Sequence, residues 1–97
     1  TFITRFPSSP YADNVLYLAG RRAFSAKNYA EAIKYYQKVI TQYSRSNKAV
    51  AAKFAKAVTY KKMNLEPQAE GVLNDLRRRY PGSPEAFRAE NELKLMR

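Results

Sequence analysis

Apolar side chains recur at steps of three and four residues along two long segments of this chain. Residues 29–43 carry the clearest stripe: Tyr29, Ala32, Ile33, Tyr36, Val39, Ile40 and Tyr43. Because one face of an α-helix recurs about every 3.6 residues, this spacing predicts an amphipathic helix. A weaker stripe precedes it: Val15, Leu18, Ala19, Ala23 and Ala26. The packed face of this earlier helix is therefore expected to contain Val15, Leu18 and Ala19.

The second segment repeats the arrangement. Its front half places apolar side chains at Val50, Phe54, Ala57, Val58 and Met63, and its back half at Ala69, Val72, Leu73, Leu76 and Tyr80. Polar breaks fall at 27–28 in the first segment and at 64–66 in the second. We therefore predict two helix hairpins, each with its turn at one of these breaks.

Three similar linkers separate the hairpins: FPSSPYA (6–12), YSRSNKA (43–49) and YPGSPEA (80–86), each starting 37 residues after the previous one. A proline in the second position ends a helix, because it has no N–H to donate. A serine in the fourth position is a favourable N-cap, and a proline in the fifth position fits the first helical turn. These residues are Pro7 and Pro81, then Ser9, Ser46 and Ser83, then Pro10 and Pro84.

The recurrence predicts an all-α solenoid of antiparallel helix hairpins, with about five to six helices in one domain over residues 1–97. TFITRF at the start aligns with KVITQY (38–43), so we expect the chain to begin partway through a repeat of a longer array. The predicted parts are the end of a preceding repeat (1–6), two repeats (10–43 and 47–80) and a terminal helix (84–97).

Both ends of such an array are expected to expose apolar side chains that a neighbouring repeat would otherwise cover. They are Phe2, Ile3 and Phe6 at one end and Phe87, Leu93 and Met96 at the other. Because exposed apolar patches mark association sites, we expect homo-oligomers formed through the terminal helices.

Composition narrows the function. Lys and Arg outnumber Asp and Glu by 18 to 8, and the net charge of +10 favours acidic partners: protein surfaces, nucleic acid or anionic lipid. The chain has no Cys and no His, and no Gly-rich phosphate loop, so we expect no catalysis, no metal site and no cofactor. No apolar run is long enough to span a bilayer. Gly20 and Gly71 fall within predicted helices, where we expect them to allow close helix contacts.

The hairpins resemble the tetratricopeptide repeat (TPR). Residues 28–40 (NYAEAIKYYQKVI) match its second helix strongly. The matching residues are Leu16, Ala19, Gly20, Ala23, Ala32 and Tyr36 in one repeat, and Ala57, Tyr60, Ala69, Leu73 and Pro81 in the next. The linkers, and a period of 37 residues rather than about 34, are similar to those of the Tol-Pal system cell division coordinator family. They are also similar to the TPR lipoprotein of the outer-membrane β-barrel assembly machinery.

This resemblance implies a non-catalytic scaffold whose first helices line a concave groove for a peptide or a partner domain. The implied groove residues are Asn14, Tyr17, Arg21, Phe24, Phe54, Val58, Lys61, Arg88 and Asn91. Core packing between helices is the alternative role for Phe24 and Phe54. We expect Tyr17 and Tyr35 to be exposed.

The Tol-Pal resemblance implies a periplasmic location and a TolA-like protein partner, and the second resemblance implies a role in outer-membrane protein assembly. The charge suggests a further alternative, a basic domain that binds nucleic acid or another polyanion. Its cations would be Arg21–Arg22, Lys61–Lys62 and Arg77–Arg79, which also lie near predicted helix C-termini, where cations complement the helix dipole. No recognised nucleic-acid motif is present, and the sequence leaves these alternatives open.

Overall fold

Helices make up all the regular structure in the described part of the protein. The computed structural model describes residues 12–95, with side chains from residue 14 onward. The helices are α2 (Ala12–Ser25), α3 (Tyr29–Gln42), α4 (Asn47–Lys62), α5 (Glu66–Arg79) and α6 (Pro84–Leu95). The predicted all-α fold of helix hairpins is confirmed. Among these helices, none combines the length and the apolar character that crossing a membrane requires.

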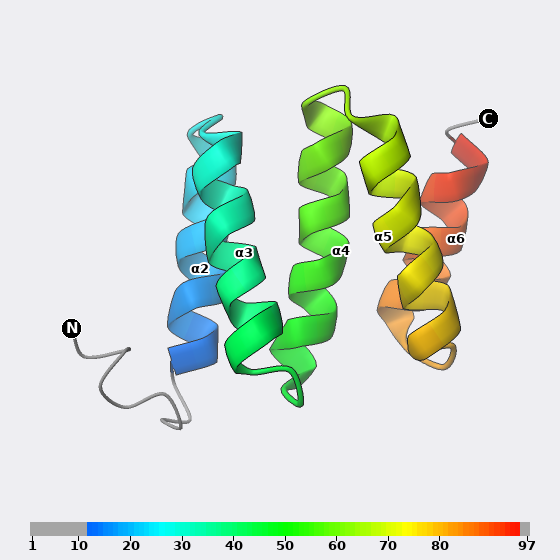
Figure 1. Cartoon of the computed structure of the whole chain (residues 1–97), viewed down its shortest axis with the longest axis horizontal. Helices are drawn as coiled ribbons and strands as arrows, with labels where there is room; N and C mark the ends of the chain where they lie inside the picture. Colours follow the sequence, from blue (N-terminus) through cyan, green and yellow to red (C-terminus); the bar gives the residue numbers. More distant parts are fainter. Residues whose placement is uncertain (1–11, 96–97) are drawn as a thin grey trace.

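The helices are arranged in two layers. Each helix contacts the next one along the chain, and α4 also contacts α2 and α6. Figure 1 shows α3 and α5 in front, α2 and α6 behind, and α4 between the α2–α3 pair and the α5–α6 pair. The first helices of successive repeats (α2, α4 and α6) therefore share one face of the molecule, and the second helices (α3 and α5) form the other.

The two hairpin turns are built alike. Lys27 and Asn64, 37 residues apart, have φ angles of 63° and 62°, in the left-handed region. In each turn the next N–H reaches back five residues, from Asn28 to the Ala23 carbonyl at 2.8 Å and from Leu65 to the Tyr60 carbonyl at 2.9 Å. This is the C-terminal capping pattern that closes a helix whose chain then reverses. Both predicted turn positions are confirmed.

The linker serines cap the helices that follow them. Ser46 Oγ accepts a hydrogen bond from the Lys48 N–H at 3.0 Å, and Ser83 Oγ accepts one from the Ala86 N–H at 3.0 Å. Each satisfies an N–H that the first helical turn leaves without a partner. Pro84 begins α6, as predicted. The corresponding predictions for Pro7, Ser9 and Pro10 lie outside the described residues.

Two apolar clusters form the core. The first joins α2, α3 and α4: Leu16, Ala32, Tyr36, Val39 and Ala52. The second joins α4, α5 and α6: Ala57, Leu73, Leu76, Ala89 and Leu93. The second-helix stripes therefore face the core as predicted. Tyr35, which we expected to be exposed, is half-buried, because it packs against the first cluster.

The packed face of α2 differs from the expectation. Val15 and Leu18 are each 49% exposed, whereas Leu16 is 4% exposed and packs against α3. The 37-residue repeat explains the difference. Val15 corresponds to Ala52 and Ala89, which are fully buried because the second helix of the preceding repeat, α3 or α5, packs against each of them. Within residues 12–95 no second helix precedes α2, so Val15 stays open.

The opposite end of the array also differs from the expectation. Leu93 is buried rather than exposed, because it lies on the face of α6 that packs against the α5 residues of the second cluster. Phe87 is exposed, as predicted. The predictions for Phe2, Ile3, Phe6 and Met96 concern side chains that lie outside the described part.

The two helical glycines have different surroundings. A Cβ added at Gly20 would lie 2.5 Å from Cε1 of Tyr36, so this glycine does allow α2 to approach α3 closely. A Cβ added at Gly71 would have no atom within 4 Å apart from the adjoining residues and backbone of its own helix. The expected close contact at Gly71 is therefore wrong, and this position opens onto unfilled space beside α5.

Candidate partner-binding groove

A groove opens on the face that the first helices share. We call it the α2–α4–α6 groove. It has a volume of about 480 Å³. Its lining comes from α2 (Tyr17, Arg21, Phe24 and Ser25), α3 (Tyr36), α4 (Phe54, Ala55 and Val58) and α6 (Arg88). Side chains from three successive first helices therefore meet in one hollow, as expected of a repeat scaffold.

Six of the nine residues expected in the groove line it: Tyr17, Arg21, Phe24, Phe54, Val58 and Arg88. Lys61 lies in an adjoining hollow of about 460 Å³ that shares Val58, and its Nζ donates to Glu92 Oε1 at 2.8 Å. Asn14 is half-buried on α2, and Asn91 is exposed on α6, and neither lines the groove. Which of these residues bind a partner stays a prediction.

The aromatic rings of the groove are also part of the core. Tyr17 is half-buried rather than exposed as expected, because its ring packs 6.0 Å from that of Tyr36. Phe24 packs 5.4 Å from Tyr29, and Phe54 packs against the second cluster. Core and groove are therefore not exclusive roles here, since each ring both packs against other aromatic or apolar residues and lines the hollow. Such rings are preorganised for contact, because little side-chain freedom remains to be lost.

The charged residues that line the groove are all positive. Its charged lining residues are Arg21 and Arg88, both exposed, and no carboxylate lines it. Neither guanidinium has an ion-pair partner among the described residues, whose ion pairs join other side chains. The groove therefore carries two available cations, each able to make paired hydrogen bonds to a carboxylate.

Tyr36 forms the floor of the groove. It is 2% exposed, and burial, reinforced by nearby Tyr17 and opposed by Arg21, raises the pKa of its hydroxyl to about 12. The hydroxyl is therefore a neutral donor at neutral pH. The sequence pattern assigned Tyr36 to the core only. Its second role depends on Gly20, whose missing side chain leaves room for the ring.

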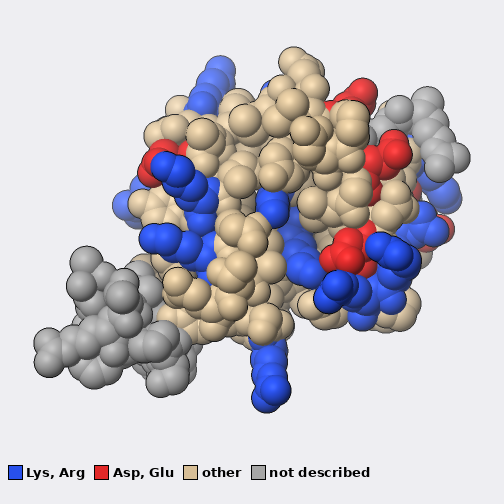
Figure 2. Space-filling model, viewed as in Figure 1, with Lys and Arg blue, Asp and Glu red and all other residues tan. Residues whose placement is uncertain are grey.

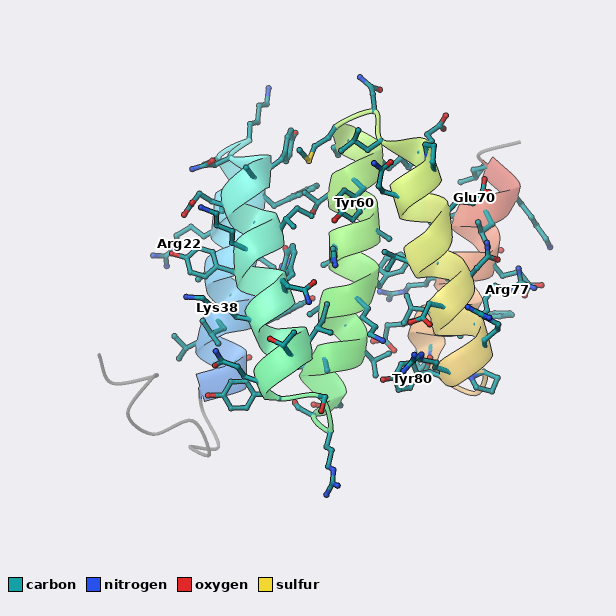
Figure 3. The ribbon with its side chains drawn as sticks, viewed as in Figure 1. Arg22, Lys38, Tyr60, Glu70, Arg77 and Tyr80 are labelled. Atoms are coloured by element: carbon teal, nitrogen blue, oxygen red, sulfur yellow. The ribbon has the colours of Figure 1, made fainter. Side chains whose placement is uncertain are left out.

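The three basic clusters do not form one surface. Arg21–Arg22 and Lys61–Lys62 lie near the C-terminal ends of α2 and α4, whereas Arg77–Arg79 end α5, which runs in the opposite direction. In Figure 3 Arg22 and Arg77 lie at opposite sides of the molecule. Arg79 Nε also donates to Asp75 Oδ1 at 2.8 Å. The high net charge is therefore spread over several faces.

The chemistry of the described residues also bears on metal binding. Three or more Asp, Glu, His or Cys side chains do not come together anywhere in residues 14–95 in a way that could hold a metal ion. What the groove offers instead is binding chemistry: aromatic and aliphatic contacts, two guanidiniums and the hydroxyl groups of Tyr17, Ser25 and Tyr36.

Comparison with known proteins agrees with the fold. No curated protein matches the sequence well enough to count as a relative. A family model described as "Tetratricopeptide repeat" matches residues 23–93, which is well over half of the chain. The matched region contains all of α3, α4 and α5, and most of α6. Helix order, hairpin turns and this match agree, and the chain belongs to the tetratricopeptide repeat family.

Proposed function

We propose that this protein is a non-catalytic interaction module that binds an acidic segment of a partner protein in the α2–α4–α6 groove. Repeats of this family generally mediate protein–protein interaction. The observation that carries the proposal is the pairing of Arg21 and Arg88 with an aromatic hollow that contains no carboxylate. A segment with acidic and apolar residues side by side complements both features.

Each part of the groove has a defined role in this proposal. The half-buried rings of Tyr17, Phe24 and Phe54 would take up an apolar side chain of the partner, in the way that interface anchors fill pockets. Arg21 and Arg88 approach from α2 and α6, so they would hold carboxylates on either side of that anchor. Opposite charge would also accelerate the encounter.

Binding of nucleic acid is the alternative from another class. It would require a continuous basic surface and bases stacked on exposed rings. The basic clusters lie at opposite ends of the helices, and the rings near Arg21 are packed on one side against Tyr36 and Tyr29. These observations favour a protein partner.

The cell-envelope role is a finer proposal and rests on the linkers alone. We propose a periplasmic location and a TolA-like partner because the three linkers and their 37-residue spacing resemble those of the Tol-Pal coordinator family. A role in outer-membrane protein assembly rests on the same linkers. Homo-oligomers through the open face of α2, which carries Val15 and Leu18, are a further proposal.

A selection experiment tests the proposed function. The protein is presented with a random peptide library and, separately, with a random single-stranded oligonucleotide, each at low and at moderate salt. We expect selected peptides to combine Asp or Glu with Leu, Ile or Phe and to keep binding at moderate salt, because apolar burial is not screened. Oligonucleotide binding with a steep salt dependence and no peptide selection would contradict the proposal.

A further inference from the structure

A second groove lies on the other face of α4, between α3 and α5. We call it the α3–α4–α5 groove. It has a volume of about 420 Å³, and its walls include Ile40 of α3 and Val72 and Gly71 of α5. Lys53, Lys56 and Tyr60 of α4 lie between these walls. Figure 2 shows Lys or Arg atoms in a hollow near the middle of this face.

The two lysines depart from the repeat. In the 37-residue register Lys53 corresponds to Leu16, which is 4% exposed, and Lys56 corresponds to Leu93, which is 5% exposed. Each lysine therefore stands where one neighbouring first helix buries a leucine. The remaining equivalents are Glu90 for Lys53, which is exposed, and Ala19 for Lys56, which is half-buried. The repeat does not need a cation at the position of Lys56, because both of its equivalents, Ala19 and Leu93, are apolar.

Only one of the two ammonium groups is neutralised. Lys53 Nζ donates to Asp75 Oδ2 at 3.1 Å and lies 5.3 Å from the centre of the Tyr80 ring. Asp75 also accepts from Arg79, so its charge is already shared between two cations. The carboxylate of Asp75 is therefore already engaged by Lys53 and Arg79, and no other acidic residue lines the groove.

Lys56 has only uncharged partners among the described residues. Its Nζ donates to the amide oxygen of Gln37 and lies 5.7 Å from the centre of the Tyr60 ring. Burial, and then the neighbouring charge of Lys53, lower the pKa of Lys56. A half-buried cation with no counter-ion is costly, and the cost falls when an anion binds beside it.

We propose that the α3–α4–α5 groove is a second binding site, which receives a carboxylate side chain from an extended segment of a partner protein. The carboxylate forms an ion pair with Lys56, and this charge-assisted bond is stronger than the present bond to Gln37. Apolar residues that flank the carboxylate contact Ile40 and Val72. The open space beside Gly71 accommodates the incoming chain.

This site is separate from the one in the proposed function. Phe54, Ala55 and Val58 of α4 face the α2–α4–α6 groove, whereas Lys53, Lys56 and Tyr60 face the α3–α4–α5 groove. A variant at one groove therefore leaves the other unchanged, and the two proposals can fail independently.

The test uses two probes that differ by a single charge: acetyl-Leu-Glu-Leu-amide and acetyl-Leu-Gln-Leu-amide. Each is titrated into the full chain with isotope-labelled lysines, and the Lys56 side-chain signals are followed by NMR. We expect the Glu peptide to shift these signals saturably and to bind about tenfold more tightly than the Gln peptide, because only the carboxylate can pair with the ammonium.

Three variants locate the binding. Lys56→Gln is expected to abolish the difference between the two peptides. Lys38→Gln, an equal loss of charge at an exposed α3 residue away from the groove (Figure 3), is expected to preserve it. Gly71→Leu extends into the open space without changing any charge, and should weaken the Glu peptide about tenfold. We expect the fold to remain intact, since a Cβ at this helical position meets no neighbouring atom.

Four results would overturn the proposal. Equal binding of the two peptides would show that no carboxylate is recognised. Unchanged binding by Gly71→Leu would place the peptide elsewhere. Inorganic phosphate that binds as tightly as the Glu peptide, in both the parent chain and Gly71→Leu, would indicate a general anion site. Loss of binding in the double variant Arg21→Gln, Arg88→Gln would assign it to the other groove.

Discussion

Replacing Tyr36 with Ala is expected to lower the free energy of unfolding by about 3–5 kcal/mol, the range for removing a buried aromatic ring. Tyr36 is 2% exposed and packs against Gly20 and Tyr17. The converse change, Gly20→Leu, forces a side chain into the space of this ring and should cost about 1–3 kcal/mol. Equilibrium unfolding in denaturant measures both changes.

The double variant Gly20→Leu, Tyr36→Ala tests whether these two residues share one space. The leucine would occupy part of the volume that the ring leaves, so the double variant should lose at least about 1 kcal/mol less than the two single losses added together. Gly71→Leu is the matched control, and should raise stability by about 0.5–1 kcal/mol because the position is helical and open. Additive losses at positions 20 and 36 would contradict the packing described here.

Removing both guanidiniums of the α2–α4–α6 groove is expected to weaken binding of a selected acidic peptide about a hundredfold. Each Arg contributes a charge-assisted hydrogen bond, and about 1.4 kcal/mol for each corresponds to a tenfold change in affinity. The variant is Arg21→Gln, Arg88→Gln, and isothermal titration calorimetry measures the dissociation constant. Stability should be nearly unchanged, because both side chains are exposed.

The control removes two other arginines and the same amount of charge. Arg22→Gln, Arg78→Gln changes exposed residues of α2 and α5 that do not line the groove. Here we expect only a few-fold loss, from the smaller long-range attraction. Equal losses in the two double variants would mean that net charge, and not the groove, attracts the peptide.

The sequence was sufficient to predict the helices, their turns and much of the candidate site. The stripe that contains Tyr36 and Val39, the breaks at Lys27 and Asn64, and the serine caps all act locally, so spacing and residue type predict them. Six groove residues were also predicted, because the first helices of a repeat array share one face. The predictions that were wrong concern contacts between a residue and helices other than its own.

Val15 shows why those contacts could not be predicted. Its spacing is that of a packed residue, and its equivalents Ala52 and Ala89 are buried, yet burial at this position depends on a preceding second helix. Gly71 shows the same limit, since helical position alone does not distinguish close packing from open space. Lys56 was not singled out at all, although comparing it with Leu93 one period later would have marked a cation at a core position.

The face shared by α2, α4 and α6 is proposed to bind an acidic partner segment. The most direct test is a backbone-amide NMR titration of the isotope-labelled chain with one acidic, apolar-containing peptide selected from the library. We predict saturable shifts centred on Tyr17, Arg21, Phe54, Val58 and Arg88, from three helices that are distant in sequence. Shifts confined to α3 and α5, or shifts that never saturate, would contradict the claim.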